Sequence, residues 1–112
     1  MSEKAYENKI KRLLTEAGAY HVKYFGCGFT QAGVPDILAC IKGRFLAIEV
    51  KDVKGKPSPL QIHNVKKIRE SGGLALIAYP KDFEALRALI EALVNESDIK
   101  KSYGYFISQS FD

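Results

Sequence analysis

The 112-residue chain is 46% hydrophobic and 27% charged, which is ordinary for a folded domain and excludes a wholly disordered protein. It has no window near the roughly 18 apolar residues of a membrane span, no visible signal peptide, and only two cysteines, too few for a disulfide framework. Residues 1–70 hold 13 basic and 7 acidic residues of a chain with net charge +4, and this asymmetry favours a polyanionic partner.

The first third of the chain predicts a helix followed by a short strand. Ser2 is a suitable cap for a helix that runs to about Ala17, because its apolar residues recur at helical spacing along one face. Gly18 ends the helix, and the aromatic and β-branched residues of 20–25 favour a strand. A glycine-rich loop follows over residues 26–35.

Two further strands, residues 36–42 and 45–51, are separated by a tight turn. Glycine at the first central position of Gly43-Arg44 suits a type II′ hairpin. This turn pairs Lys42 with Phe45, and the same register predicts that Asp36 lies opposite Lys51.

The next segment predicts a helix and a buried strand. Ser58 caps the helix, with proline at its first position and Gln61 closing a capping box. Residues 74–79 form a continuous apolar strand, as expected for a sheet covered on both faces. Because a helical crossover leads to it, this strand should lie parallel to a neighbour.

The end of the chain predicts one more helix and a tail. Apolar residues repeat at helical spacing over 83–93. We expect a single domain over residues 1–94 and a C-terminal tail over 95–112, in which 103–107 form an extra strand or an interaction segment. The whole order indicates an α/β fold, a mixed sheet with helices on its faces.

Two acids and a lysine meet at the open end of the predicted hairpin. Glu49 and Lys51 are two residues apart and share a face, and Asp36 lies at the same end. Carboxylates crowded among packed strands lose hydration and repel each other, and a hard cation such as Mg²⁺ relieves both problems. A metal there acidifies its bound water and neutralises charge on phosphorus, while Lys51 orients the water or stabilises negative charge. The pattern predicts a phosphodiester hydrolysis site that uses Mg²⁺ or Mn²⁺.

The competing interpretation is a cross-strand salt bridge between Asp36 and Lys51. It leaves Glu49 without a partner and gives Pro35 no role. An acid-x-Lys pattern occurs four times in the chain, but only residues 49–51 lie on a core strand whose pairing brings a second acid alongside. The predicted geometry therefore favours the metal site.

These motifs resemble those of the PD-(D/E)XK nuclease superfamily, with P-D and E-x-K on consecutive strands between two helices. Residues 32–39 (AGVPDILA) and 45–51 (FLAIEVK) are similar to its VRR-NUC branch, the virus-type replication-repair nucleases, within a resemblance that covers residues 2–93. The resemblance implies a mixed sheet with α-β-β-β-α-β order and a metal-dependent deoxyribonuclease. Standalone members of that branch resemble homodimers that cut four-way DNA junctions.

The resemblance also implies roles for individual residues. Asp36 and Glu49 would be metal ligands together with the backbone carbonyl of Val50, and Lys51 would be the catalytic lysine. Gln61 matches a motif glutamine that supports the site, and a purely capping role for it stays equally open.

The family pattern includes an acid on the first helix as well. Glu7 fits this position better than Glu3, because it borders the apolar stripe of the helix. The resemblance makes Glu7 a catalytic residue and a further candidate metal ligand, and a solvated helix acid is the alternative.

Basic and polar residues around this site are candidates for DNA contacts, and a solvated surface is the alternative for each. A flexible loop can bring backbone N–H groups to phosphate, and lysines give affinity without reading sequence. No sequence-reading motif is apparent, so we expect binding that selects DNA structure, above all branched DNA. The candidates are Lys9, Arg12, Thr30, Gln31, Lys54, Lys56 and Lys66.

Cutting both strands of a symmetric junction requires two sites, which a twofold homodimer supplies. The aromatic tail (Tyr103, Tyr105, Phe106 and Phe111) either forms that interface or packs on its own domain. We expect a cytoplasmic protein of a bacterial or phage-infected cell that does not bind membranes. The alternative to an endonuclease is a non-catalytic nucleic-acid-binding module with the same fold, which the intact acid and lysine set disfavours.

Overall fold

One mixed sheet with helices on both faces makes up the computed structural model, which describes residues 1–26, 30–109 and 111. The strands lie in the order β1-β2-β3-β4; the first two pairs are antiparallel, and β4 joins β3 in parallel. The predicted α/β fold and its α-β-β-β-α-β order are confirmed. In this part of the chain the elements are α1 (Glu3–Glu16), β1 (Tyr20–Lys23), β2 (Ile37–Ile41), β3 (Arg44–Val50), α2 (Pro59–Glu70), β4 (Leu74–Ala78), the 3₁₀ turn η1 (Pro80–Asp82), α3 (Phe83–Asn95) and α4 (Ile99–Ile107).

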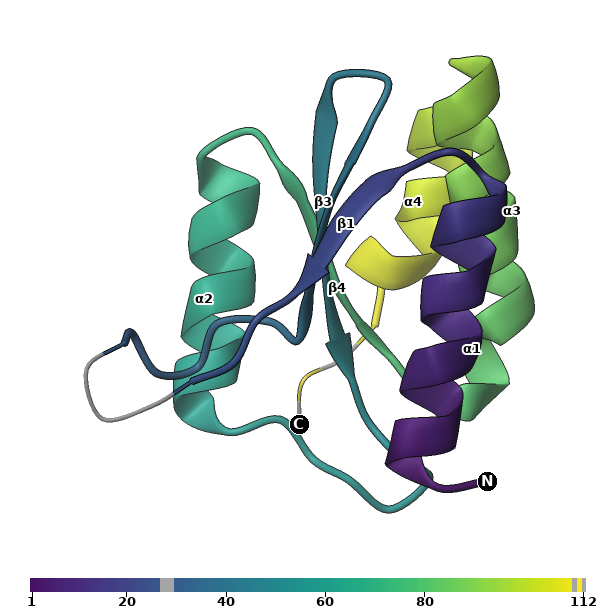
Figure 1. Ribbon diagram of the computed structural model, residues 1–112. Helices are drawn as coiled ribbons and strands as arrows, with labels where there is room; N and C mark the ends of the chain where they lie inside the picture. Colours follow the sequence, from purple (N-terminus) through teal and green to yellow (C-terminus); the bar gives the residue numbers. More distant parts are fainter. Residues whose placement is uncertain (27–29, 110, 112) are drawn as a thin grey trace.

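The two faces of the sheet carry cores of different size. Helices α1 and α3 cover one face and α2 covers the other (Figure 1). The larger core joins α1, α3 and Phe106 of α4 to alternate strand residues such as Ile48 and Val50. The smaller core lies on the α2 side and consists of Ala47, Val65, Ala75 and Ile77. Because side chains alternate along a strand, Glu49 points to the α2 side.

Both predicted helix caps are present. The Ser2 hydroxyl accepts a hydrogen bond from the Ala5 N–H at 3.1 Å. Ser58 and Gln61 bond reciprocally, since each side chain accepts a hydrogen bond from the other residue's backbone N–H. These local bonds fix where α1 and α2 begin.

The predicted hairpin turn is wrong by one residue, and the predicted register by two. Ile41 pairs with Arg44, so the two turn residues are Lys42 and Gly43. Their φ angles are 51° and 81°, as a type I′ turn requires. A shift of two residues keeps every side chain on its predicted face. Continued one residue beyond the Ile37–Ile48 pair, this register places Asp36 beside Glu49 instead of opposite Lys51.

The predicted extra strand over 103–107 is also wrong, because these residues belong to α4. Phe106 is fully buried in the larger core. The Tyr103 hydroxyl accepts a hydrogen bond from the Ala75 N–H at 2.9 Å and donates one to the Ala75 carbonyl at 3.0 Å. The Tyr105 hydroxyl donates to Asp82. These tail aromatics therefore pack on their own chain.

No helix in the described ranges is both long and apolar enough to cross a membrane.

Candidate active site

Glu49 is a buried carboxylate with only one occupied oxygen. Its side chain extends from β3 on the α2 side of the sheet, and the residue is 2% exposed. One oxygen, Oε2, is 3.2 Å from the Lys51 ammonium, as the predicted shared face requires. The other oxygen, Oε1, is buried and has no hydrogen-bond partner in the described structure. Burial, followed by the negative charge of Asp36, raises the pKa of Glu49 to about 7, and Lys51 offsets only part of this effect.

Asp36 lies at the open end of the hairpin, and each of its carboxylate oxygens has a partner. Its Oδ2 accepts a hydrogen bond from the Val50 N–H at 2.8 Å, which fixes the side chain against β3. Its Oδ1 is 3.3 Å from the Lys23 ammonium. Pro35, directly before it, is buried. Asp36, Glu49 and Lys51 thus meet at one end of the sheet, although Lys51 pairs with Glu49 and not with Asp36.

Lys23 is the site residue that the sequence analysis missed. From the end of β1 it donates to Glu7 Oε1 at 2.7 Å and to Asp36 at 3.3 Å. Burial would lower the pKa of Lys23, but the hydrogen bond to Glu7 and the charge of Asp36 outweigh it and raise that pKa. The sequence does hold an indication of this role. Lys23 lies on the inward-facing side of β1, and β1 pairs with β2 next to Asp36.

Glu7 is buried among ammonium groups. It is 5% exposed, and Lys11 lies 3.0 Å and Lys4 3.5 Å from its carboxylate, in addition to Lys23. Burial alone would raise the pKa of Glu7, but the hydrogen bonds from Lys23 and Lys11 lower it to about 2. Glu3, the alternative, is exposed.

The structure does not gather Glu7 with the other two acids. Within residues 1–26, 30–109 and 111, no three His, Cys, Asp or Glu side chains are close enough to hold a metal ion together. Glu7 belongs to α1, on the opposite face of the sheet from Glu49, and the Lys23 ammonium lies between Glu7 and Asp36. The pair Asp36 and Glu49, with one bare buried oxygen, has the oxygen chemistry that Mg²⁺ or Mn²⁺ accepts.

Gln61 has its capping function in this structure. Its Oε1 accepts the Ser58 N–H at 2.9 Å, and the residue is half-buried at the start of α2. The amide can still donate through Nε2. The supporting role suggested by the resemblance is therefore compatible with the cap but is not tested by it.

Comparison with protein families shows which family the chain belongs to. The family model described as archaeal Holliday junction resolvase (Hjc) matches residues 2–109. The chain belongs to the Hjc family. This family is of the PD-(D/E)XK nuclease type, so the predicted superfamily is confirmed, whereas the VRR-NUC branch is not shown.

A solved structure supports the same Hjc fold. The chain is similar to Hjc of Archaeoglobus fulgidus, a Holliday junction resolvase from an archaeal hyperthermophile, with 28% sequence identity and a TM-score of 0.53. The match covers 67% of this chain and 64% of that chain, so it spans just under two thirds of the solved protein. Comparison with curated proteins finds no match.

The DNA-contact residues predicted for this Hjc-family chain fall into two groups. Lys9 and Arg12 lie on α1, where the Lys9 ammonium sits 4.0 Å from the centre of the Phe83 ring. The second group lies around the end of the sheet that carries Asp36 and Glu49, or on α2. In that group the Lys54, Lys56 and Lys66 side chains are exposed, and Thr30 and Gln31 belong to the loop before Asp36.

Residues 30–35 of the glycine-rich loop before Asp36 are packed against α2. Gln31 donates to the Asn64 side chain at 3.0 Å. Gly33 has φ of +79°, and a Cβ there would come within 2.7 Å of the Leu60 side chain. Gly28 lies outside the described residues. At Gly33 the requirement for glycine is explained by this close approach to α2.

Proposed function

We propose that this chain is a metal-dependent DNA endonuclease that hydrolyses phosphodiester bonds in branched DNA such as four-way junctions. The observation that carries the proposal is the buried, half-satisfied carboxylate of Glu49 between Asp36 and Lys51. Membership of the Hjc family and the likeness to the Archaeoglobus fulgidus resolvase support the reaction and the substrate. The finer assignment to the VRR-NUC branch remains a hypothesis, which rests on residues 32–39 and 45–51.

Asp36 and Glu49 would hold the metal, Mg²⁺ or Mn²⁺, with the backbone carbonyl of Val50 as a third oxygen. The fit rests on the bare Oε1 of Glu49, since a buried anionic oxygen without a donor is stabilised by a cation. When bound, such an ion supplies charge neutralisation at the phosphate and lowers the pKa of a coordinated water. The Val50 N–H positions Asp36 for this role through its 2.8 Å hydrogen bond.

Lys51 would act on the reacting phosphate. Its ammonium is 3.2 Å from Glu49 and 14% exposed, so it faces the site in a partly desolvated setting where its charge is effective. It would stabilise negative charge that develops on the phosphate or orient the attacking water. Gln61 would donate to that water or to the phosphate. Glu7 would act indirectly, because its ion pair with Lys23 holds the ammonium that also contacts Asp36.

DNA would be held by phosphate contacts without sequence reading. The group near the site, Gln31, Thr30, Lys54, Lys56 and Lys66, would hold the strand that is cut. Lys9 and Arg12 on α1 lie on a separate surface and would contact a second arm of the junction. Binding through lysines makes affinity fall with rising salt concentration.

A homodimer would supply the second site for a symmetric junction. The sheet offers an apolar strip for this interface on the α2 side, which begins beside that helix at Phe45 and continues to Tyr20. Tyr20, Cys40 and Phe45 are aligned by strand pairing, and Tyr20 and Phe45 are 74% and 42% exposed. Exposed apolar strips of this kind favour contact with another protein surface. Light scattering on the parent and on Tyr20→Ser tests the interface, and equal monomer mass for both would contradict it.

A cleavage assay tests the proposed function. Labelled four-way junction, flap and linear duplex are incubated with the protein in Mg²⁺, in Mn²⁺ and in chelator. We expect junction cleavage only with the divalent ion. Glu49→Gln should bind the junction and lower cleavage by at least about 10³-fold. If no substrate is cut while junction binding persists, the non-catalytic binding module becomes the better interpretation.

A further inference from the structure

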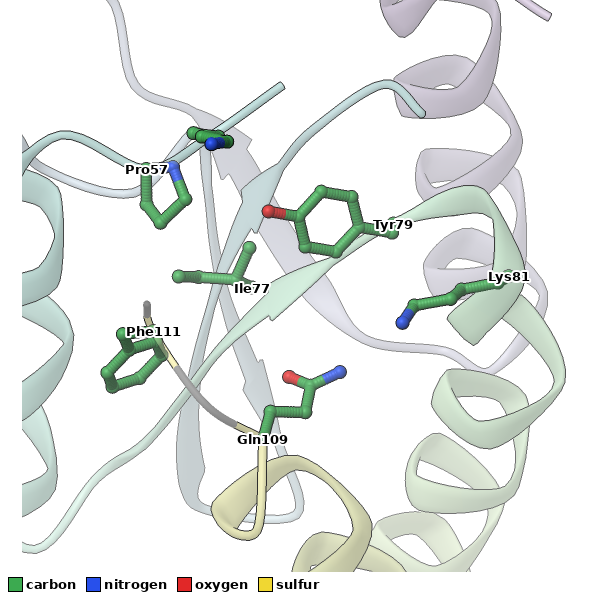
Figure 2. A pocket seen from close by; sticks show the side chains of 7 residues that line it. Pro57, Ile77, Tyr79, Lys81, Gln109 and Phe111 are labelled. Atoms are coloured by element: carbon green, nitrogen blue, oxygen red, sulfur yellow. The ribbon is translucent and has the colours of Figure 1, made fainter. Parts of the chain in front are cut away.

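Two cavities lie side by side at the end of β4, and Lys56, Tyr79 and Lys81 line both. The first has a volume of about 350 Å³ and is completed by Pro57, Ile77, Gln109 and Phe111, as Figure 2 shows. The second has a volume of about 630 Å³ and follows residues 53–56 and Pro80. Together they form a groove that runs past the Tyr79 side chain.

This groove adjoins the catalytic residues. Ile77 pairs with Glu49 in the parallel register of β3 and β4, and the Lys51 N–H donates to the Ala78 carbonyl at 3.0 Å. Ile77 and Tyr79 pack on the α2-side core, the same side as Glu49. Neighbouring strands are about 4.8 Å apart. A nucleotide whose phosphate lies at Glu49 can therefore reach the first cavity.

The first cavity is lined by an aliphatic side chain, two aromatic rings and a side-chain amide. Ile77 provides an apolar floor and is 2% exposed. The Tyr79 and Phe111 rings border the cavity, and the Gln109 amide lies at its rim (Figure 2). Aromatic rings stack on unpaired bases, and an amide can hydrogen-bond to a base edge.

The described residues that line the groove carry charge of one sign. Lys54, Lys56 and Lys81 contribute ammonium groups, and no acidic residue is among the described residues that line either cavity. Lys81 lies 5.9 Å from the centre of the Tyr79 ring, which places a cation beside the stacking surface. Such a groove is complementary to a phosphate backbone whose bases are unstacked.

We propose that the first cavity binds one unpaired DNA base next to the phosphate that is cut. The proposal rests on the endonuclease function above and gives it a reason to act at branch points where a base has left its stack, because a base inside a continuous duplex stays stacked and cannot enter. Tyr79 stacks on the base, and Lys56 and Lys81 hold the phosphate of the same nucleotide. The volume of about 350 Å³ lies within the usual range for a small-ligand pocket.

Binding experiments in chelator test the base pocket without cleavage. Three duplexes are compared: one with a single unpaired adenosine, one with an abasic residue in its place, and one fully paired. We expect the parent protein to bind the unpaired adenosine about tenfold more tightly than the abasic residue, from stacking alone. Replacing that adenosine by 2-aminopurine should give a fluorescence change on binding. Equal affinity for the adenosine and abasic duplexes would overturn the proposal without any variant.

Variants assign the effect to the pocket. Tyr79→Leu should reduce the tenfold ratio to about one, whereas Tyr79→Phe, which keeps the ring, should retain it. Lys81→Gln should weaken binding to all three duplexes about equally, and Lys100→Gln, an exposed lysine on α4, should change nothing. An unchanged ratio in folded Tyr79→Leu would assign the discrimination elsewhere and overturn the pocket. A protein that discriminates the base but never cuts DNA would overturn only the endonuclease function.

Discussion

Glu7 and Glu49 are both buried glutamates, yet their surroundings have opposite effects. Glu7 is surrounded by three lysine ammonium groups, and its pKa is lowered to about 2. Glu49 has one lysine on one oxygen and no cation on the other, Asp36 lies beside it, and its pKa is raised to about 7. Burial alone does not decide the charge of an acid; the charges of both signs around it do. The surroundings of Glu7 keep it charged, whereas those of Glu49 favour the binding of a cation.

The lysine beside Glu49, Lys51, should matter for DNA cleavage. We expect Lys51→Gln to lower junction cleavage by about 10²–10³-fold, because it removes the ammonium that we propose acts on the reacting phosphate. Junction binding in chelator should be nearly unchanged. Single-turnover cleavage and a gel-shift assay measure the two quantities, with Lys42→Gln in the exposed hairpin turn as the control. Parental cleavage by Lys51→Gln would remove it from the mechanism.

Lys23 should matter for stability. Lys23→Met leaves Glu7 buried without its nearest ammonium, and we expect the free energy of unfolding to fall by about 3 kcal/mol. Lys4→Met removes an exposed partner 3.5 Å from the same carboxylate and should cost less than about 0.5 kcal/mol. Urea denaturation at pH 7 measures both. An equal loss of unfolding free energy in Lys23→Met and Lys4→Met would contradict the view that the buried ion pair of Lys23 with Glu7 stabilises the fold.

Acid should weaken the Glu7 cluster. Because the folded pKa of Glu7 is about 2 and its ordinary value is 4.5, its contribution to stability is complete above pH 4.5 and is lost as the pH falls towards 2. Glu7→Gln should lack this contribution, so the stability gap between parent and variant should shrink by about 2 kcal/mol over that window. Thermal melts across the window measure the gap. A gap independent of pH would contradict the low pKa.

Glu49 should show the opposite trend in chelator. Its folded pKa of about 7 lies above the ordinary 4.5, so its ionisation makes the parent lose stability as the pH rises from 4.5 to 7. Glu49→Gln should avoid this loss, which we expect to be about 2 kcal/mol, because the pKa shift is as large as that of Glu7. Thermal melts with and without Mg²⁺ complete the test, because Mg²⁺ should stabilise only the parent. Stabilisation of Glu49→Gln by the same Mg²⁺ concentration would contradict the assignment of Glu49 as a ligand.

The sequence predicted the elements and faces of this site because those depend on local periodicity. Glu49 and Lys51 share a face at any register, and Ser58 with Gln61 caps a helix through neighbouring atoms. The hairpin register was not predictable in the same way. A shift of two residues keeps the hydrophobic pattern intact, so only the turn distinguishes the registers, and Lys42 accepts a positive φ that its side chain does not favour.

Contacts between distant segments escaped the sequence for a different reason. Lys23 meets Glu7 and Asp36 across sequence separations of 16 and 13 residues, and no local pattern encodes such a meeting. The tail was interpretable in retrospect. Tyr103 and Phe106 are three residues apart, which places them on one face of a helix.

The Tyr103 hydroxyl has a consequence for how the molecule behaves at high concentration. It occupies both backbone hydrogen-bonding groups of Ala75 on the outermost strand, and Arg69 donates to the same carbonyl. An incoming strand from another molecule finds no free donor or acceptor at that point. This flank is thereby protected against strand addition by another molecule, and Tyr103→Phe would free the Ala75 N–H while Arg69 still covers the carbonyl.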